Sequence, residues 1–454
     1  DGGWGWFSGW GERSWPHTTS VVVHGLHLAR ANGVTLPDAM LERGVEWLKN
    51  HQIEQVRRLQ NWEKELEPRK RYADAEDALV FSVLAEEKHD HPAMREFLYR
   101  DRNELPVYAK CLFALAAHRV GDVEKRDMLR RNVEQFLARD DENQTAYLRM
   151  PENNRWWFWH GSEIEAMAAY LKLLAAVEPK GDTAPRLVKY LVNNRKHATY
   201  WNSTRDTAFC IEAFADYLAA SGEDRPDMTL TVRVDGAPVK TVAINAGNLF
   251  SFDNRALLEG ERLAAGAHRI ELVRQGVGPV YFNAWLTNFT LEDPITHAGL
   301  EIKVTRKFYK LQRVEKTIKA EGTGGRALDQ RVEKFERIAL PDPALLKSGD
   351  FVEVELEIES KNDYEYVVFE DMKPAGFEPV EVRSGYTQNA MGAYVEFRDE
   401  RVVFFVRALA RGTHSVAYRV RAEIPGLFSA LPARGSAMYA PELKANSDET
   451  KVRI

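Results

Sequence analysis

The sequence has few cysteines and no apolar run long enough to cross a membrane. Only Cys111 and Cys210 occur among 454 residues, and neither shows a Cys-x-x-Cys or Cys/His spacing typical of a metal or redox site. No apolar stretch approaches the roughly 18 residues that a membrane-spanning helix requires. Both cysteines lie in apolar helical contexts, so we expect small buried hydrophobic residues, with a disulfide between neighbouring helices as the alternative.

An excess of charge of either sign is also absent. The 62 Lys and Arg residues are scattered among 68 Asp and Glu residues, which gives a net charge of −6. Binding of nucleic acid or of an anionic membrane depends on clustered positive charge, so neither is expected. The content of 44% hydrophobic and 29% charged residues is typical of a globular chain, and its length predicts several domains.

Recognisable catalytic and targeting motifs are missing as well. No Gly-x-Ser-x-Gly, P-loop or dinucleotide-binding fingerprint is present. The chain begins at Asp1, without Met and without a charged-then-apolar leader, inside a stretch rich in Gly and Trp. We therefore expect a fragment of a longer precursor.

The first half of the chain repeats one theme, in which an apolar helix rich in Ala, Leu and Val is followed by a more charged helix. Apolar residues recur at i, i+3 and i+4, as in Leu112, Leu115 and Ala116, and Asp38 and Ser162 are expected helix caps. The expected apolar helices are residues 18–31, 74–85, 108–118, 162–176 and 204–220. The expected amphipathic helices are residues 38–50, 123–139 and 184–194. This repeat predicts an inner and an outer ring of helices, an α/α toroid, with an open solenoid as the alternative.

The pattern changes to a period of two after the polar segment 221–226. Residues 229–236 alternate between apolar and polar side chains, and Asp235-Gly236 offers a hairpin turn. A second series of alternating segments begins at Gly299. Short strands with one solvated face are typical of antiparallel β-sandwiches. We therefore predict a multidomain α + β protein, with an α/α-toroid helical domain followed by two antiparallel β-sandwich domains.

Two enzyme interpretations concern acids and bases in the helical part. The opening Asp1-Gly-Gly-Trp-Gly and the segment Asp74-Ala-Glu-Asp77 resemble parts of polyprenyl cyclases, whose acid protonates an alkene. Here the central acid is Glu76, and acids are favoured at a helix start by its dipole, so capping is the preferred interpretation. Asn153, Arg155 and His160 are residue types of a uronate lyase, but no spacing supports that activity.

A metal site and an aromatic site are the other candidates. His89, Asp90 and His91 offer too few ligands for a metal, so we expect a solvent-exposed polar loop and no metal or cofactor. Many of the 11 Trp residues precede apolar helices. Such rings plug the ends of helix pairs at little entropic cost, while lining of a sugar or lipid site is the alternative. The residues concerned are Trp4, Trp6, Trp10, Trp15, Trp156, Trp157, Trp159 and Trp201.

Three strings, together with the order of the parts, carry a family resemblance. They begin at Asp1 (Asp-Gly-Gly-Trp-Gly-Trp-Phe), at Tyr200 (Tyr-Trp-Asn-Ser-Thr-Arg-Asp-Thr-Ala) and at Met438 (Met-Tyr-Ala-Pro-Glu-Leu-Lys-Ala-Asn-Ser-Asp-Glu). Over essentially its whole length the chain resembles the carboxy-terminal part of a bacterial α2-macroglobulin, a relative of the complement proteins. The resemblance implies a thioester-domain toroid lacking its first helices (1–224), a small CUB-like β domain (225–297) and a macroglobulin-like or receptor-binding-like sandwich (298–454).

The resemblance also implies a function. Members of the family are non-enzymatic protease traps: cleavage by an endopeptidase triggers a rearrangement that exposes an internal Cys-x-Glu-Gln thioester, which acylates the attacker. Endopeptidases are then the partners, and neither nucleic acid nor a small-molecule cofactor is involved. A periplasmic or cell-envelope location, a role in host defence and a lipid anchor upstream of this fragment follow in the same way.

The chain departs from that family pattern in one respect. It contains no Cys-x-Glu-Gln, because Leu-Phe-Ala follows Cys111 and Ile-Glu-Ala follows Cys210. The thioester would precede the Asp-Gly-Gly segment, or the parent belongs to a thioester-free branch that traps proteases sterically; both remain open. The rival functions are an α/α-toroid enzyme acting on a polyprenyl or polysaccharide substrate and a purely structural or adhesive module.

Two residues are assigned a role by the resemblance alone. Met438 and Tyr439 correspond to a loop that packs over the thioester in bacterial members, so the shielding role is expected of them. The alternative is that both side chains anchor this loop against the core of their own domain.

Overall fold

A computed structural model describes the chain in two compact units. It covers residues 1–454 except 7–10, 38, 151–161, 196–198, 261–262, 264–265, 283, 285–293, 322–326, 387–388 and 441–442, and the side chains of 315–333. One unit comprises Asp1–Asn193 with Ser203–Trp285, and the other Asn194–Asn202 with Leu286–Ile454. We call residues 1–221 the helical region and residues 298–454 the terminal β region. The predicted division into three domains stays a prediction.

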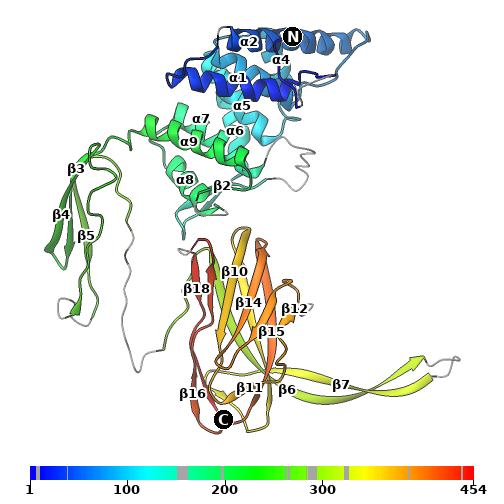
Figure 1. The fold of residues 1–454 in the computed structure, drawn as a ribbon, viewed down its shortest axis with the longest axis vertical. Helices are drawn as coiled ribbons and strands as arrows, with labels where there is room; N and C mark the ends of the chain where they lie inside the picture. The colour runs from blue at the N-terminus through cyan, green and yellow to red at the C-terminus, as the bar shows by residue number, and fades with distance from the viewer. Residues whose placement is uncertain are drawn as a thin grey trace. The chain divides into compact units, whose positions relative to one another are not determined.

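The helical region contains a helix at each expected position and some additional elements, but the helix expected over residues 38–50 continues to Glu63. Its helices, within the described residues, are α1 (Pro16–Ala31), α2 (Met40–Glu63), α3 (Ala75–Glu86), α4 (Pro92–Arg100), α5 (Val107–Arg119), α6 (Val123–Glu134), α7 (Glu163–Val177), α8 (Thr183–Asn193) and α9 (Thr204–Ser221). The apolar helices pack in chain order, with α1 on α3, α3 on α5, α5 on α7 and α7 on α9 (Figure 1). Nearly every residue of α5 and α7 is buried, which explains why these helices are apolar all round.

Polar side chains fix where several helices begin. The Ser162 hydroxyl accepts a hydrogen bond from the Glu165 amide at 3.1 Å, as its predicted capping role requires. Ser203 caps α9 in the same way through the Asp206 amide at 3.0 Å. The other predicted cap, Asp38, lies outside the described residues, and α2 starts at Met40.

One predicted helix is too long. The segment 123–139 was expected to be a single helix, but α6 ends at Glu134 and a hairpin of β1 (Leu137–Asp140) and β2 (Thr145–Leu148) follows. The Asn143 side chain and amide both donate to the Asp140 carboxylate, and Gln144 adopts a left-handed φ of 54°. This local turn ends the helical pattern that Phe136 and Leu137 would otherwise continue.

A small antiparallel sheet follows α9. Its order is β4 (Ala237–Asn245), β3 (Asp227–Val234) and β5 (Ile270–Val277). Asp235 and Gly236, with φ of 52° and 82°, form the two-residue turn between β3 and β4, which confirms the predicted hairpin.

The terminal β region consists of three sheets within the described residues. Its strands are β6 (Ile302–Glu321), β7 (Ala327–Ala339), β8 (Ala344–Leu345), β9 (Phe351–Ser360), β10 (Tyr364–Met372), β11 (Phe377–Pro379), β12 (Gly385–Tyr386), β13 (Tyr394–Phe397), β14 (Arg401–Leu409), β15 (Gly412–Ala422), β16 (Leu427–Ala430), β17 (Arg434–Ala437), β18 (Lys444–Asn446) and β19 (Thr450–Arg453). The sheets have the orders β12-β13-β14-β10-β17-β18, β11-β15-β9-β6-β7 and β16-β19-β8. Contrary to an all-antiparallel expectation, β19 pairs with β8 in parallel.

Apolar and polar side chains alternate along the strands, and the apolar ones form one core between the two large sheets. Val354 and Leu356 of β9 face the same buried cluster as Phe369 of β10 and Phe404 of β14. Inside this core the Arg306 guanidinium pairs with the Asp371 carboxylate at 2.8 Å, both side chains being 1% exposed. The carbonyls of Leu431 and Ala430 accept hydrogen bonds from the two terminal guanidinium nitrogens, whereas Nε has no acceptor among the described residues. The buried charge therefore has both a counter-charge and further acceptors.

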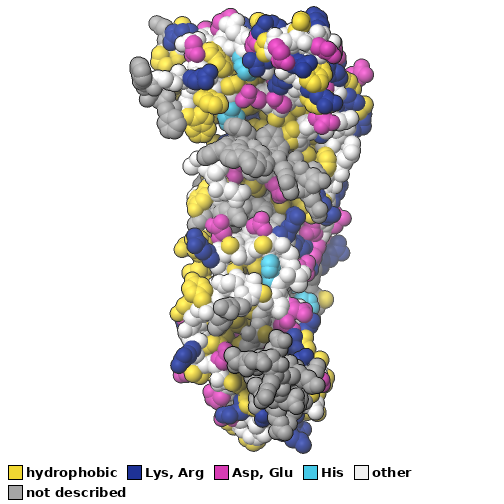
Figure 2. Space-filling view, turned by 90° about the vertical axis from the view of Figure 1, so that its right-hand side faces the viewer, with side chains coloured by type: hydrophobic (Ala, Val, Ile, Leu, Met, Phe, Trp, Pro, Cys, Tyr) yellow, Lys and Arg dark blue, Asp and Glu magenta, His cyan; other side chains and the backbone are white. Residues whose placement is uncertain are grey.

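The surface is mixed in charge. Figure 2 shows Lys and Arg side chains interspersed with Asp and Glu over the described part of the face that it draws. Among the described residues, no helix has the length and apolar character needed to span a membrane.

Candidate functional site

Met438 and Tyr439 lie in the short connection between β17 and β18. The loop is tied down on both sides: the Ala437 amide donates to the Leu443 carbonyl at 3.1 Å, and Ala437 and Leu443 belong to the core cluster. The side chains of Met438 and Tyr439 are 54% and 49% exposed and are not part of that cluster. The loop is therefore anchored by its flanking residues, while the two candidate side chains are displayed outward.

Tyr366 of β10 is the neighbour of this pair. Its carbonyl accepts a hydrogen bond from the Met438 amide at 2.9 Å, and its ring meets the Tyr439 ring edge to face at 5.3 Å between centroids. Tyr366 has a φ of 54°, a left-handed conformation that is uncommon for a large side chain.

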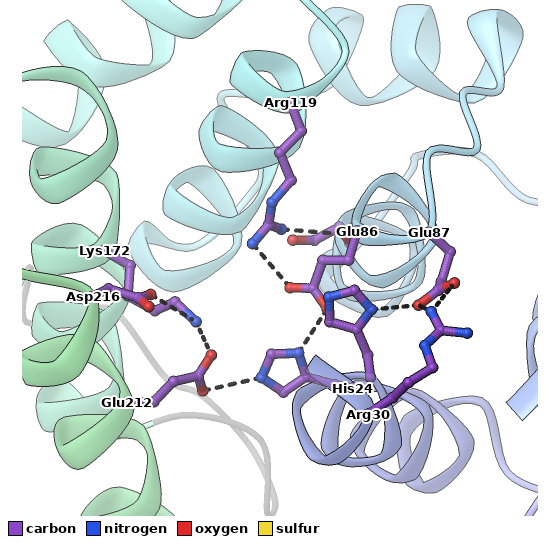
Figure 3. Close-up of polar contacts among 10 residues, drawn as sticks. His24, Arg30, Glu86, Glu87, Arg119, Lys172, Glu212 and Asp216 are labelled. Carbon is purple, nitrogen blue, oxygen red and sulfur yellow. Dashed lines mark hydrogen bonds and ion pairs between the residues drawn. The ribbon is translucent and has the colours of Figure 1, made fainter. Parts of the chain in front are cut away.

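A second candidate is a network of charged side chains that joins five helices. His24 of α1 lies between two carboxylates, with Nδ1 at 2.7 Å from Glu86 of α3 and Nε2 at 3.0 Å from Glu212 of α9 (Figure 3). Because both ring nitrogens face carboxylates, both must donate, and the ring is an imidazolium. Burial opposes the charge of His24, but the two carboxylates outweigh burial and raise its pKa to about 9.

Two further cations complete the network, which we call the five-helix network. Lys172 of α7 forms an ion pair with Glu212 and lies 3.5 Å from Asp216, and Arg119 of α5 binds Glu86 at 3.0 Å. Burial raises the pKa of Glu212, yet the hydrogen bond from His24 and the charge of Lys172 outweigh it, and the pKa falls to about 2. Glu86 and Glu212 are thus each shared by two cations from different helices.

A smaller ion cluster lies beside the five-helix network. Glu87 accepts hydrogen bonds from His27 and, at 2.8 Å and 2.9 Å, from Arg30, so that the end of α3 is tied to α1 a second time (Figure 3). Together these contacts form cross-links between helices. Every described member of the five-helix network has an oppositely charged partner, so none is free to act as an acid, base or nucleophile.

The acidic segment that resembles a cyclase motif is a helix cap. Asp74 accepts hydrogen bonds from the Glu76 and Asp77 amides, and the Asp77 carboxylate accepts one from the Asp74 amide at 2.9 Å. Lys70 lies 2.7 Å from both aspartates. Burial raises the pKa of Glu76 to about 7 and that of Asp77 to about 6, but Asp77 is 2% exposed and fully engaged.

The remaining candidates are not brought together as sites. Both cysteines are free and buried, and burial raises the pKa of each thiol, as the core interpretation requires. His91 caps α4 through the Met94 amide and Asp90 pairs with Arg95 at 3.2 Å. No group of three potential metal ligands occurs among the described residues. Asn153, Arg155 and His160 lie outside them, as do Trp10, Trp156, Trp157 and Trp159.

Sequence reasoning missed the five-helix network, although the signal was present. His24 follows three valines, Lys172 sits between leucines, and Glu212 follows Cys210-Ile211 in helices that are otherwise apolar. A charge within an apolar helix indicates a partner on a neighbouring helix, since an unpaired buried charge is costly. The pattern identifies the residues but does not predict which of them form ion pairs.

Comparison with known proteins identifies relatives of this chain. Residues 302–442 match the family model described as the bacterial alpha-2-macroglobulin MG10 domain. An alpha-2-macroglobulin homolog of Nostoc sp. is 25% identical over 321 residues, covering 68% of this chain and 16% of the relative. An alpha-2-macroglobulin of Thermotoga maritima is 25% identical over 314 residues, covering 68% of this chain and 15% of the relative. The chain thus spans about a sixth of the length of the curated relatives that it matches.

Solved structures are also similar over the whole chain, at low identity. Trypsin-activated alpha-2-macroglobulin from Escherichia coli has a TM-score of 0.43 at 17% identity, with 100% of this chain and 28% of that chain covered. Salmonella alpha-2-macroglobulin reacted with methylamine has a TM-score of 0.35 at 18% identity, with 100% and 26% covered.

Proposed function

This chain belongs to the bacterial α2-macroglobulin family, and from that premise we propose that it is the carboxy-terminal part of a non-enzymatic protease trap. The terminal β region would hold Met438 and Tyr439 over a reactive thioester supplied from outside these residues. One observation carries this proposal: both side chains are displayed outward from a loop whose flanking residues are fixed in the core of an MG10-type domain.

The finer architecture is part of the proposal. An α/α toroid is supported by the chain-order packing of α1, α3, α5, α7 and α9, together with the hydrogen bond between His24 on the first and Glu212 on the last of these helices. A terminal sandwich is supported by the core that two large sheets share. The segment 225–297 would be the small CUB-like domain, and the parent protein would act in the periplasm or cell envelope.

The rival enzyme function lacks comparable support. A cyclase acid must be protonated and face its substrate, whereas Asp77 is buried and bound by Lys70 and by its own helix cap. The five-helix network has the same limitation, because opposite charges occupy its carboxylates.

The trap is tested with the complete precursor and several endopeptidases of different specificity. After incubation, a trapped protease should still cleave small peptide substrates and lose activity on large protein substrates. Protease–precursor adducts that survive denaturing electrophoresis would assign the thioester mechanism, and protection without adducts would assign steric trapping. Unchanged activity on large substrates for every protease, with no complex formed, would contradict the proposal.

A further inference from the structure

Tyr366 occupies a conformation that its own side chain disfavours. A left-handed φ is readily adopted by Gly and tolerated by Asn, but it crowds the Cβ of a large residue. Residues on both sides of it remain in the regular register of β10 with β14, where Glu365 pairs with Ala408 and Val367 with Val406. The distortion is therefore confined to one residue, and something must compensate for its cost.

Two contacts that can offset this cost involve the Met438–Tyr439 loop. The β10–β17 ladder ends with Val367 opposite Ala437, and the Met438 amide extends it by donating to the Tyr366 carbonyl at 2.9 Å. The Tyr366 ring, 36% exposed, meets the edge of the Tyr439 ring at an interplanar angle of 84°. Backbone and ring of one residue thus contact both members of the pair.

We propose that Tyr366 is a positioning residue that holds Met438 and Tyr439 in their outward arrangement and thereby sets how readily this loop leaves the group that it covers. The second half of this statement rests on the shielding role proposed above; the first half concerns the terminal β region alone. The carbonyl of Tyr366 fixes where Met438 leaves the sheet, and its ring limits the rotamers of Tyr439. Loss of the ring frees Tyr439, and loss of the left-handed backbone also frees Met438.

The same sheet offers a matched control at its other edge. Tyr386 of β12 meets Tyr394 of β13 edge to face at 5.3 Å with an interplanar angle of 79°, nearly the geometry of the Tyr366–Tyr439 pair. Tyr386 is exposed, and β12 and β17 lie on opposite sides of β13, β14 and β10 in the sheet order. Tyr386→Ala therefore removes an equivalent ring contact without touching the loop.

The first readout uses the 454-residue chain and needs no thioester. Hydrogen exchange at the Met438 amide should accelerate about tenfold in Tyr366→Val, because a β-branched residue resists the left-handed backbone. Tyr366→Asn, which tolerates that backbone, should leave this amide close to wild type while Tyr439 becomes more reactive to nitration. Tyr366→Phe should resemble wild type in both measurements, and Tyr386→Ala should leave both unchanged. Equal exchange and equal nitration in wild type and all Tyr366 variants would overturn the positioning role.

The second readout is the rate at which the full-length protein reacts with methylamine. Tyr366→Ala and Tyr439→Ala should both react about fivefold or more faster than wild type, and Tyr366→Phe and Tyr386→Ala at the wild-type rate. An unchanged melting temperature separates positioning from general destabilisation. A faster Tyr439→Ala with an unchanged Tyr366→Ala would overturn the positioning role and leave the shield intact. Unchanged rates in both, or no amine incorporation at all, would instead refute the shield, and the exchange and nitration data would still decide whether Tyr366 orders the loop.

Discussion

The helical region and the terminal β region bury charge in opposite ways. In the terminal β region one pair, Arg306 and Asp371, is sealed at 1% exposure, and the carbonyls of Ala430 and Leu431 accept further hydrogen bonds from the guanidinium. In the helical region Glu86 and Glu212 of the five-helix network are each shared between cations of different helices, and the imidazolium of His24 remains 18% exposed. The first arrangement fixes a single pair within the core that the two large sheets share. The second couples the packing of five helices to the protonation of one histidine.

The largest effect is expected from breaking the sealed pair. Asp371→Asn leaves the Arg306 guanidinium buried without a counter-charge, which should lower the free energy of unfolding of the terminal β region by about 3–5 kcal/mol. Hydrogen exchange followed by mass spectrometry on peptides of β6, β10 and β14 measures the loss. The matched surface change, Glu357→Gln, breaks the exposed ion pair with Lys307 and should lower the free energy of unfolding far less, because solvent screens this pair. Equal losses in the two variants would contradict the contrast.

Breaking the five-helix network should lower the free energy of unfolding by a smaller amount. Glu212→Gln removes one carboxylate from His24 and Lys172, but His24 keeps Glu86 and Lys172 keeps Asp216, so a loss of about 1.5–3 kcal/mol is expected. Exchange in peptides of α1, α7 and α9 reports it. Asp216→Asn is the control, because its carboxylate is 47% exposed and secondary to Glu212 in binding Lys172. A cost for Asp216→Asn as large as for Glu212→Gln would show that the network is not centred on Glu212.

The helical region should respond to alkaline pH through His24. The pKa of His24 is about 9 in the folded chain and about 6.5 when unfolded, so its stabilisation is complete below pH 6.5 and is lost as the pH rises towards 9. The loss should be about 2 kcal/mol. Tryptophan fluorescence in urea unfolding reports mainly on this region, because 10 of the 11 Trp residues lie within residues 1–221 and none lies in the terminal β region. His24→Gln should abolish the dependence; a dependence that persists in this variant would assign it to another group.

The smallest expected effect concerns a local cap. Ser162→Ala removes the acceptor for the Glu165 amide and the hydroxyl that donates to Asp206 at 2.6 Å, which should cost about 1 kcal/mol. Ser162→Thr keeps the hydroxyl and should recover most of that loss. Exchange at the first amides of α7 measures both variants. Identical exchange in wild type and Ser162→Ala would show that this cap does not contribute.

Elements of the fold with local signals could be predicted from the sequence. The apolar repeat predicted helices at the positions of α1, α3, α5, α7 and α9. Asp235-Gly236 predicted a hairpin turn because both residues tolerate a left-handed backbone. The helix over 123–139 was wrong at its end because the turn at residues 140–144 depends on side-chain hydrogen bonds within that turn. The parallel β8–β19 pair joins residues more than a hundred positions apart, for which periodicity holds no information.

For the candidate sites too, features that depend on neighbouring residues in the sequence could be predicted, and features that depend on the fold could not. Met438 and Tyr439 were found through a family resemblance, and their exposure could not be predicted, since a thioether and an aromatic ring favour a core equally well. The role of Tyr366 could not be predicted from the sequence, because its left-handed φ depends on the residues that surround it in the fold. His24 and Glu212 were visible as isolated charges, but their pairing across 188 positions required the fold.

The most direct test of the central claim is the reactivity of the full-length protein towards methylamine when Met438 and Tyr439 are both replaced by alanine. If these side chains cover a thioester, the double variant should incorporate the amine roughly tenfold faster than wild type before any protease is added, while its melting temperature stays the same. Incorporation at the wild-type rate would contradict the account.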